Sequence, residues 1–581
     1  MKTSISIRPN SIWVYLIALI AYLPTAARTV QEADAGQFLS LGAQCLKSSW
    51  PLAHPPGYPI ETAIACGSAW LATITAPVPA ALWLAWASAL FTALAAGLAY
   101  SSLTRLKLAS PVQALFTVAA LFLSRDVWRA ATTQEPLGLG LLTLTAGIFL
   151  PLLAMQTSHA ITTAVTGVIK VRWLWLLSGA AFGLGFANHH TTAMALPGAL
   201  WCLWQASLKK NSAGQFRLSA LGYFLIGAVI GALPIVLILI KTLNPQEFAA
   251  TSATGPVPAF DWVTSASNPL GYLLRTEFGT FSLAQNKAAA NLTSLAALQL
   301  FLSDLPKNLG WFGIICAGHG FIVMIRNRKF GLPFYLPFSF TLFAGMAFLI
   351  LNKFPADTDF IDIIRRFHPF VLMTFLPFMA AGLSDFWRRL MQWRPKASAA
   401  IAAILGALLA GQIMLTLPDA RRDQRTFAEE HFIRALNLLP PGSLLVAASD
   451  EEIFGLSYAQ VALGIRPDVR ILNLLEWSHP IKRQQVLARI GIDPSSMINL
   501  NRGELIGILA TREPLWIIDP PIPPRPDYLA SVPCIGPYLI LDLRKNPEIK
   551  QSQAIVPSLD SRPWLASDQS LLDKYLSCRN P

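Results

Sequence analysis

Long apolar stretches recur along most of the chain and are separated by short polar connections. A helix needs roughly 20 apolar residues to cross the hydrocarbon core of a bilayer, where its own backbone must satisfy every polar group. The stretches that suit this role cover residues 11–27, 79–102, 109–124, 136–155, 173–188, 190–207, 218–241, 308–326, 331–351, 367–385 and 397–417. The pattern predicts a polytopic α-helical membrane protein with about eleven transmembrane helices.

The basic residues concentrate in alternate connections between these stretches. They are Arg105 and Lys107; Lys170 and Arg172; Lys209, Lys210 and Arg217; Arg326, Arg328 and Lys329; and Arg388, Arg389, Arg394 and Lys396. Cytoplasmic loops carry such an excess of Lys and Arg. Residues 28–78, 125–135, 242–307 and 352–366 are therefore expected on the outer face. A full span near 58–77 would invert this register, so that segment is predicted to be short or re-entrant.

Composition narrows the picture further. Of 581 residues, 54% are hydrophobic and 13% charged, as suits a membrane chain. The net charge of +13 could suggest a nucleic-acid partner, but the positive residues sit in membrane loops, so we expect no nucleic acid. The first apolar stretch could be a signal peptide. We expect it to be kept as an anchor, because cleavage would untether the segment that follows.

The pattern changes after residue 417. Short strand-like runs ("SLLVAASD", "DVRILNLLEW", "PLWIID", "YLILDL") alternate with helical ones ("FAEEHFIRALNLL", "IKRQQVLARIGI"). This alternation predicts a small α/β domain over residues 418–581, on the outer face, after a transmembrane domain over 1–417. Cys534 and Cys578 lie in the predicted domain, and whether they form a disulfide is open. No phosphate-binding glycine loop and no zinc-type spacing occurs, so neither a nucleotide site nor a zinc site is predicted.

The first outer loop, "DAGQFLSLGAQCLKSSWPLAHPPGYPI", covers residues 34–60. Its polar residues recur at spacings of three and four, which predicts an amphipathic helix lying at the membrane interface. Asp34 stands at the start of this helix, where a carboxylate could simply cap free backbone N–H groups. The proline-rich turn that follows carries His54 and Tyr58 and returns the chain to the membrane. Such stiffness favours a site over a linker.

Other outer segments carry further candidate residues. Glu135 precedes Pro136, where it could cap a helix or act in a site. Arg365 and Arg366 lie where the chain re-enters the bilayer and could hold a phosphate or contact lipid headgroups. The remaining candidates for contacts with a ligand or with the first loop are Gln37, Asn188, His189, His190 and His368. Asp357, Asp359 and Asp362 could cap a helix or hold a divalent cation.

These residue types suit one chemistry. A lipid-linked phosphosugar would place its prenyl tail in the bilayer, its phosphate at the boundary and its sugar outside. A carboxylate there can deprotonate an acceptor hydroxyl, and arginine can stabilise the departing phosphate. A carrier or flippase of lipid-linked sugars would also bind this donor, although a transporter should carry ionisable residues at mid-depth. A ligase that transfers whole glycans could use the same phosphate site.

The motifs also carry a resemblance. "DAGQF" followed by "HPPGYP" resembles the first outer loop of a GT-C superfamily family that is similar to protein O-mannosyltransferases and occurs in bacteria and animals. "VWRAATTQEPLGL", "GLGFANHHTTAMALPG", "AFDWVTSASNPLGYLL" and the C-terminal "PPGSLLVAASDEEIFGLSYAQVALGIRPDVRILN" resemble later segments of that family in the same order. The resemblance implies transfer of a sugar, with mannose as the first candidate, from a polyprenyl-phosphate donor.

The resemblance also assigns roles. It carries the catalytic acid onto Asp34 and a second acid onto Glu135, while Gln37 replaces the glutamate usual in D-x-G-E-F. That replacement leaves Asp34 as the one acid of the motif. The acceptor would be a protein or a glycan. The expected location is a bacterial inner membrane, crossed several times, with the site and the C-terminal domain outside the cytoplasm.

Overall fold

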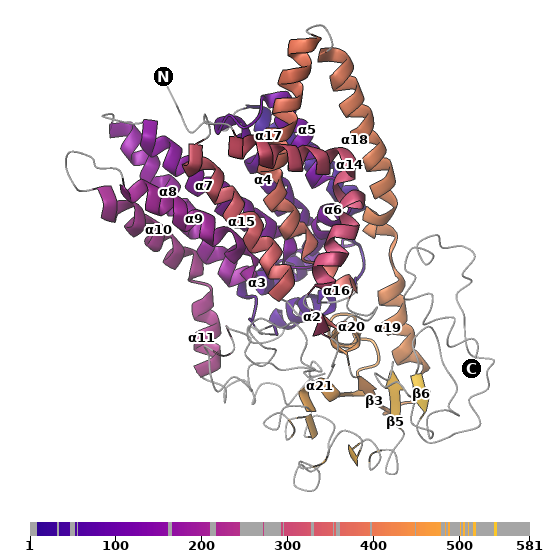
Figure 1. Cartoon of the computed structure of the whole chain (residues 1–581). Helices are drawn as coiled ribbons and strands as arrows, with labels where there is room; N and C mark the ends of the chain where they lie inside the picture. The colour runs from indigo at the N-terminus through magenta and orange to yellow at the C-terminus, as the bar shows by residue number, and fades with distance from the viewer. Residues whose placement is uncertain are drawn as a thin grey trace.

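The computed structural model is a bundle of helices with a small sheet at one end (Figure 1). It describes residues 9–31, 34–46, 53–54, 56–160, 165–208, 216–243, 295–326, 331–351, 361–394, 398–447 and 449–477, with isolated shorter pieces elsewhere up to residue 542. The predictions about Asp357, Asp359, Cys534 and Cys578 lie outside the described residues, as does most of loop 242–307.

The helices of the bundle follow the apolar stretches closely. They are α1 (Pro9–Tyr22), α3 (Pro59–Ile74), α4 (Ala80–Arg105), α5 (Pro111–Phe122), α6 (Arg125–Ala131), α7 (Leu137–Ala160), α8 (Val165–Asn188), α9 (Leu196–Leu208), α10 (Phe216–Ala232), α11 (Ile235–Leu243), α14 (Ala296–Arg326), α15 (Gly331–Leu351), α16 (Ile361–Arg365), α17 (His368–Trp393) and α18 (Ser398–Ala420). The segment predicted to be short or re-entrant is α3, which has 16 residues.

Among the described residues, five helical stretches are long and apolar enough to cross a membrane, judged by length and composition. They are Ala80–Arg105, Leu137–Ser158, Ala296–Arg326, Ile363–Trp393 and Ser398–Leu438. Four shorter apolar helices, Ser11–Thr25, Pro111–Phe122, Ser219–Ala232 and Tyr335–Leu351, accompany them. The count of eleven spans stays a prediction.

Small residues allow the helices to approach closely. Gly179 and Gly183 on α8 face Gly227 and Gly231 on α10, and a Cβ at any of these positions would collide with the backbone of the other helix. Helices in lipid associate largely through such close packing, because lipid tails are as apolar as the side chains they replace. These four glycines explain why α8 and α10 approach each other so closely.

The first outer loop folds as a helical hairpin of α2 (Ala35–Cys45) and α3, joined by a disulfide between Cys45 and Cys66 whose Cα atoms are 5.6 Å apart. The expectation of a surface amphipathic helix is wrong for α2, because Gln37 and Ser40 on its polar side are fully buried. The Ser40 hydroxyl donates to the Gly36 carbonyl at 2.7 Å, and the side-chain oxygen of Gln37 has His54 as its partner.

The C-terminal elements lie at the same end of the bundle as α2 (Figure 1). They are α19 (Phe427–Leu438), β3 (Leu444–Ala447), α20 (Asp450–Val461), β4 (Arg470–Asn473), α21 (Leu474–Trp477), β5 (Leu515–Ile518) and β6 (Ile540–Asp542). The sheet order is β4-β3-β5-β6, with β3 parallel to β4 and β5, and β6 antiparallel to β5. The division of the chain into two domains at residue 417 stays a prediction.

Helix α20 packs directly on α2. A Cβ on Gly36 would collide with the backbone of Phe454, so only glycine permits this approach. The Phe454 ring also stacks on His54 at 5.9 Å between ring centroids. The C-terminal part of the chain therefore covers the first outer loop.

Candidate active site

Two segments from the first and second outer loops run side by side. The Ala27 N–H donates to the Thr132 carbonyl at 3.0 Å. Further along, the Gln31 N–H donates to Oε1 of Gln134 at 3.3 Å, and the amide of that glutamine donates to the Thr29 carbonyl at 2.9 Å. These bonds end shortly before Asp34 in the first segment and directly before Glu135 in the second. They explain how two acids about a hundred positions apart in the sequence come together.

The two acids meet at Arg366. Its guanidinium nitrogens lie 3.6 Å from Asp34 Oδ2 and 3.8 Å from Glu135 Oε1. Asp34 occupies the N-cap position of α2, but its side chain forms no capping hydrogen bond. The side chains of Asp34 and Arg366 are 26% and 22% exposed, so a ligand can reach them, whereas the side chain of Glu135 is 9% exposed. One cation thus holds two carboxylates at the end of the bundle.

Glu135 is held in an electrostatic balance. Burial raises the pKa of its carboxyl, and the charge of Asp34 raises it further, while Arg366, Arg129 and Arg422 oppose this rise. Two cations besides Arg366 therefore lie near the acids. Arg422 lies in the turn after α18. The sequence analysis did not name this arginine as a candidate site residue. Nothing in its local pattern separates it from the other interfacial arginines.

Sequence reasoning also missed Glu61. It lies in the first turn of α3 and is 3% exposed. Burial and then the charge of Glu135 raise the pKa of Glu61 to about 8, so this carboxyl is mostly protonated at neutral pH. An acid in a first helical turn usually stabilises the helix dipole. Nothing in the local sequence separates Glu61 from that ordinary role.

The backbone around Glu135 is fixed by two helices. The Ser88 hydroxyl on α4 donates to the Glu135 carbonyl at 3.1 Å. The Asn188 side-chain amide, at the end of α8, donates to the Pro136 carbonyl at 2.8 Å. Asn188 is fully buried. The structure therefore gives this predicted binding residue a different contact, with the backbone directly after Glu135.

The remaining first-loop candidates form a polar and aromatic group beside α2. Gln37 Oε1 lies 2.5 Å from Nδ1 of His54. The His54 ring is 5.0 Å from that of Tyr58, which lies 6.1 Å from His189. Tyr58 has a φ of 40°, directly after Gly57 at 96°. A left-handed conformation is unusual for tyrosine and indicates that the surrounding packing fixes the turn.

The two adjacent histidines diverge. The His189 ring stacks on Phe370 at 5.3 Å and faces the first loop through Tyr58. The His190 ring lies 6.0 Å from Phe186 on α8. The structure therefore brings His189 next to Tyr58 of the first loop.

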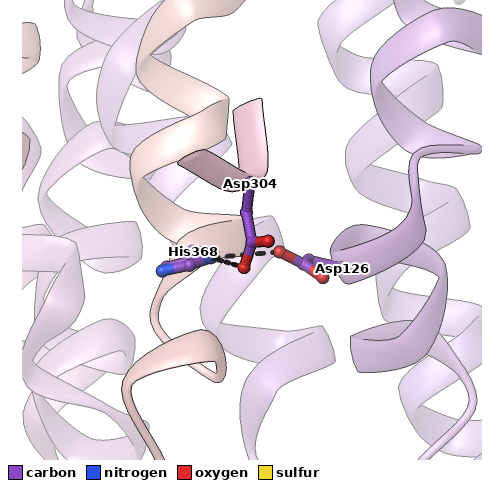
Figure 2. Close-up of side chains that lie close together, drawn as sticks. All are labelled: Asp126, Asp304 and His368. Carbon is purple, nitrogen blue, oxygen red and sulfur yellow. Dashed lines mark hydrogen bonds and ion pairs between the residues drawn. The ribbon is translucent and has the colours of Figure 1, made fainter. Parts of the chain in front are cut away.

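The adjacent Arg365 and Arg366 contact different partners. Arg365 Nε donates to Asp304 Oδ2 at 2.9 Å, in a buried network that contains Asp126 and His368 (Figure 2). His368 Nδ1 lies 3.1 Å from Asp126 Oδ2 and 3.9 Å from Asp304 Oδ2. Although burial raises the pKa of Asp126, its hydrogen bond with His368 and the charge of Arg125 hold that pKa well below its usual range. Arg365 and His368 thus belong to the network of Asp126 and Asp304. Arg366 instead lies beside Asp34 and Glu135.

Asp126, Asp304 and His368 could together offer ligands to one cation, since one ligand atom of each lies within 4.8 Å of the others. Arg125 and Arg365 already pair with the two carboxylates, at 2.9 Å from Asp126 and 2.9 Å from Asp304. The geometry is that of an ionic network joining α6, α14 and α17. Asp362, a candidate cation ligand, lies on α16, and its carboxylate is outside the described side chains.

Part of the chain is similar in sequence to one protein family, and most of it is similar in structure to a solved protein. Residues 34–213 match the family described as "Protein O-mannosyl-transferase TMEM260 N-terminal domain", a match that begins at Asp34 and includes Glu135. No curated protein matches the chain significantly by sequence. The structure resembles that of ArnT from Cupriavidus metallidurans bound to undecaprenyl phosphate, with a TM-score of 0.51 and 12% identity over 80% of this chain and 89% of that one.

The arabinofuranosyltransferase AftD from Mycobacteria shows a weaker likeness, with a TM-score of 0.34 and 14% identity over 77% of this chain and 30% of that one. The likeness to ArnT shows the fold: the chain is a multi-pass helical membrane protein with the fold of that protein.

Proposed function

We propose that the protein transfers a sugar from a polyprenyl-phosphate donor to an acceptor hydroxyl on the extracytoplasmic side of the membrane. The observation that carries this proposal is the position of Arg366 between Asp34 and Glu135. The name of the matching family supports sugar transfer, with mannose as the first sugar to test. The likeness to ArnT, whose structure holds undecaprenyl phosphate, supports the donor class.

In this mechanism Asp34 is the general base. It accepts the proton of the acceptor hydroxyl while that oxygen attacks the anomeric carbon of the sugar. The bond between this carbon and the phosphate oxygen breaks, and polyprenyl phosphate leaves with the negative charge. Asp34 afterwards releases its proton to water. The products are the glycosylated acceptor and polyprenyl phosphate.

Arg366 has two partners in this scheme. Without donor, it pairs with both acids. A donor phosphate would attract the guanidinium through charge-assisted hydrogen bonds, which would loosen its contact with Asp34 and leave that carboxylate free to accept a proton. Glu135, whose carbonyl and the next one along the chain accept hydrogen bonds from Ser88 and Asn188, keeps the guanidinium near the phosphate position. Arg129 and Arg422 add positive charge for the departing phosphate.

The outer-face location rests on two independent observations. The basic connections alternate along the chain as the positive-inside rule requires. The disulfide between Cys45 and Cys66 lies in the first outer loop, and disulfides persist mainly in oxidising compartments outside the cytoplasm. A bacterial inner membrane, with the site facing the periplasm, satisfies both observations.

Gln37 stands where the resembling family has a glutamate, which could indicate a carrier of lipid-linked sugars that has lost catalytic activity. Gln37 is fully buried and hydrogen-bonded to His54. Its side chain supports the turn of the first loop, so the absence of a second acid there does not remove the base at Asp34. This observation favours the enzyme over the carrier.

Proteoliposomes containing the purified protein and a radiolabelled polyprenyl-phosphate monosaccharide test the proposal. Extracted membrane protein and glycan supply the acceptors, and a matched sample lacks the protein. We expect covalent label on an acceptor together with released polyprenyl phosphate. Label that only crosses the bilayer would support the carrier and contradict the proposal. Transfer of a preassembled glycan, with no transfer of a monosaccharide, would instead support a ligase.

A further inference from the structure

A hollow lies between α14, α17 and α18 and is lined by residues from the end of α17 and the first half of α18. The end of α17 and the start of α18 lie at the end of the bundle opposite the C-terminal elements (Figure 1). Its volume is about 590 Å³. Most of its lining is apolar, with Phe312 and Ile315 on α14, Phe386 and Leu390 on α17, and Leu405 and Leu408 on α18. Such a groove on a membrane helix bundle suits a hydrocarbon chain.

One edge of the groove is cationic. Arg389 lines it, with Arg388 beside it on α17 and Arg394 directly after that helix. The side chains of Arg388 and Arg389 are 56% and 67% exposed, although both contact Asp385. His319 Nε2 lies 2.8 Å from the same carboxylate. The guanidinium of Arg394 lies over the ring of Trp393, which also lines the groove. Arg388, Arg389 and Arg394 together outweigh the single negative charge of Asp385, which leaves positive charge beside the apolar groove.

The groove lies at the opposite membrane surface from Arg366. Arg389 is 21 residues after His368, the first residue of α17, and a rise of 1.5 Å per residue separates them by about 30 Å. This length matches the hydrocarbon core of a bilayer. A lipid whose phosphate sits at Arg389 therefore cannot place that phosphate at Arg366, so the groove is separate from the proposed donor site.

We propose that this groove binds an anionic phospholipid of the cytoplasmic leaflet. One acyl chain would fill the apolar hollow, and the phosphate of the headgroup would contact Arg389, with Arg388 and Arg394 close by. Charge complementarity carries the choice of occupant, because a zwitterionic lipid would gain less from the excess of guanidinium groups. Anionic lipids are also enriched in the leaflet that faces basic membrane loops.

The test uses the purified full chain in detergent, equilibrated with equal amounts of phosphatidylglycerol and phosphatidylcholine of the same chain length. Native mass spectrometry then counts the lipids that remain bound. We expect preferential retention of phosphatidylglycerol. Arg389→Gln should weaken its binding about fivefold, the usual contribution of one arginine near an anionic surface. Arg326→Gln, an exposed arginine at the end of α14, is the matched control and should bind as the wild type does.

A second variant separates the site from a general effect of charge. Leu408→Trp fills the hollow and keeps every arginine, and we expect it to lose phosphatidylglycerol as Arg389→Gln does. Equal retention of the two lipids by the wild type would overturn the proposal. So would unchanged binding in both groove variants, or displacement of phosphatidylglycerol by equimolar undecaprenyl phosphate, because the occupant would then be a prenyl lipid.

Discussion

Arg366 Nη1 lies 3.6 Å from Asp34 Oδ2, and this contact joins the start of the first-loop helix to the start of α17. The same guanidinium lies 3.8 Å from Glu135, so it links three segments that are far apart in the sequence. A bridging cation of this kind can exchange a carboxylate for a phosphate. The first predictions concern this exchange.

Replacing Arg366 should impair transfer and leave the fold intact. Lysine keeps the charge but loses the planar fork that binds a phosphate through two hydrogen bonds. We expect Arg366→Lys to lower kcat/KM at least about tenfold, a loss typical of one charge-assisted contact. Initial rates with labelled donor measure this change.

Arg365→Gln, a substitution at the neighbouring arginine, tests whether the two arginines have different roles. Arg365 Nε donates to the buried Asp304, and a hydrogen bond to a charged group contributes about 1.5–3 kcal/mol. We therefore expect a clear fall in the thermal midpoint of Arg365→Gln and little change in that of Arg366→Lys. The reverse result would mean that the two arginines have been assigned to the wrong sites.

The disulfide between Cys45 and Cys66 should stabilise the first outer loop. It spans 21 positions, and closing a loop of this length contributes about 3 kcal/mol in the chain-entropy view. We expect dithiothreitol, or Cys45→Ser, to lower the thermal midpoint and the transfer rate together. Cys202→Ser, a buried free cysteine, is the control for reductant sensitivity and should respond to dithiothreitol as the wild type does. A wild type unaffected by reduction would contradict this role.

The contact between α2 and α20 should be needed for activity. Gly36→Val places a side chain against the backbone of Phe454, so α20 must move away from the first loop. We expect strongly reduced transfer and faster proteolysis within residues 449–477. Gly67→Ala on α3 is the control, since a Cβ there meets nothing within 4 Å. Equal behaviour of the two variants would show that this interface does not matter to the site.

Glu61 should make stability depend on pH. Its pKa is raised to about 8 in the folded protein, so the folded state binds a proton that the unfolded state releases near pH 4.5. Its stabilising contribution is fully present below pH 4.5 and falls as the pH rises toward 8, by at most about 1.4 kcal/mol per pH unit. Thermal midpoints of the wild type should decline over this range more steeply than those of Glu61→Gln. Parallel profiles would contradict the shifted pKa.

The positions of the membrane helices could be predicted because each depends on a local property. The apolar stretch at 79–102 became α4, Ala80–Arg105, and the stretch at 397–417 became α18, Ser398–Ala420. Asp34 and Glu135 also stood out locally, as acids at the ends of apolar segments. Only the family resemblance suggested that Glu135 is the partner of Asp34. No local pattern indicates it, because Gln31 and Gln134, which bring the two segments together, look ordinary in the sequence.

The rest of the site depends on contacts that no local pattern encodes. The sequence presented Arg365 and Arg366 as one pair, but a helix start rotates adjacent side chains in different directions, so they face different partners. The pairing of Cys45 with Cys66 depends on the α2–α3 hairpin, whose polar residues suggested a surface helix. In this hairpin His54 is the partner of the Gln37 side-chain oxygen, and the helix backbone accepts a hydrogen bond from the Ser40 hydroxyl.

The most direct test of the proposed mechanism is sugar transfer by Asp34→Asn, a variant of nearly equal size that cannot accept the acceptor proton. Initial rates with radiolabelled polyprenyl-phosphate monosaccharide should fall at least about a hundredfold, as expected when a general base is lost, while donor binding is retained. Asp468→Asn, an exposed acid paired with Arg466, is the control and should transfer at the wild-type rate. Wild-type transfer by Asp34→Asn would contradict the mechanism.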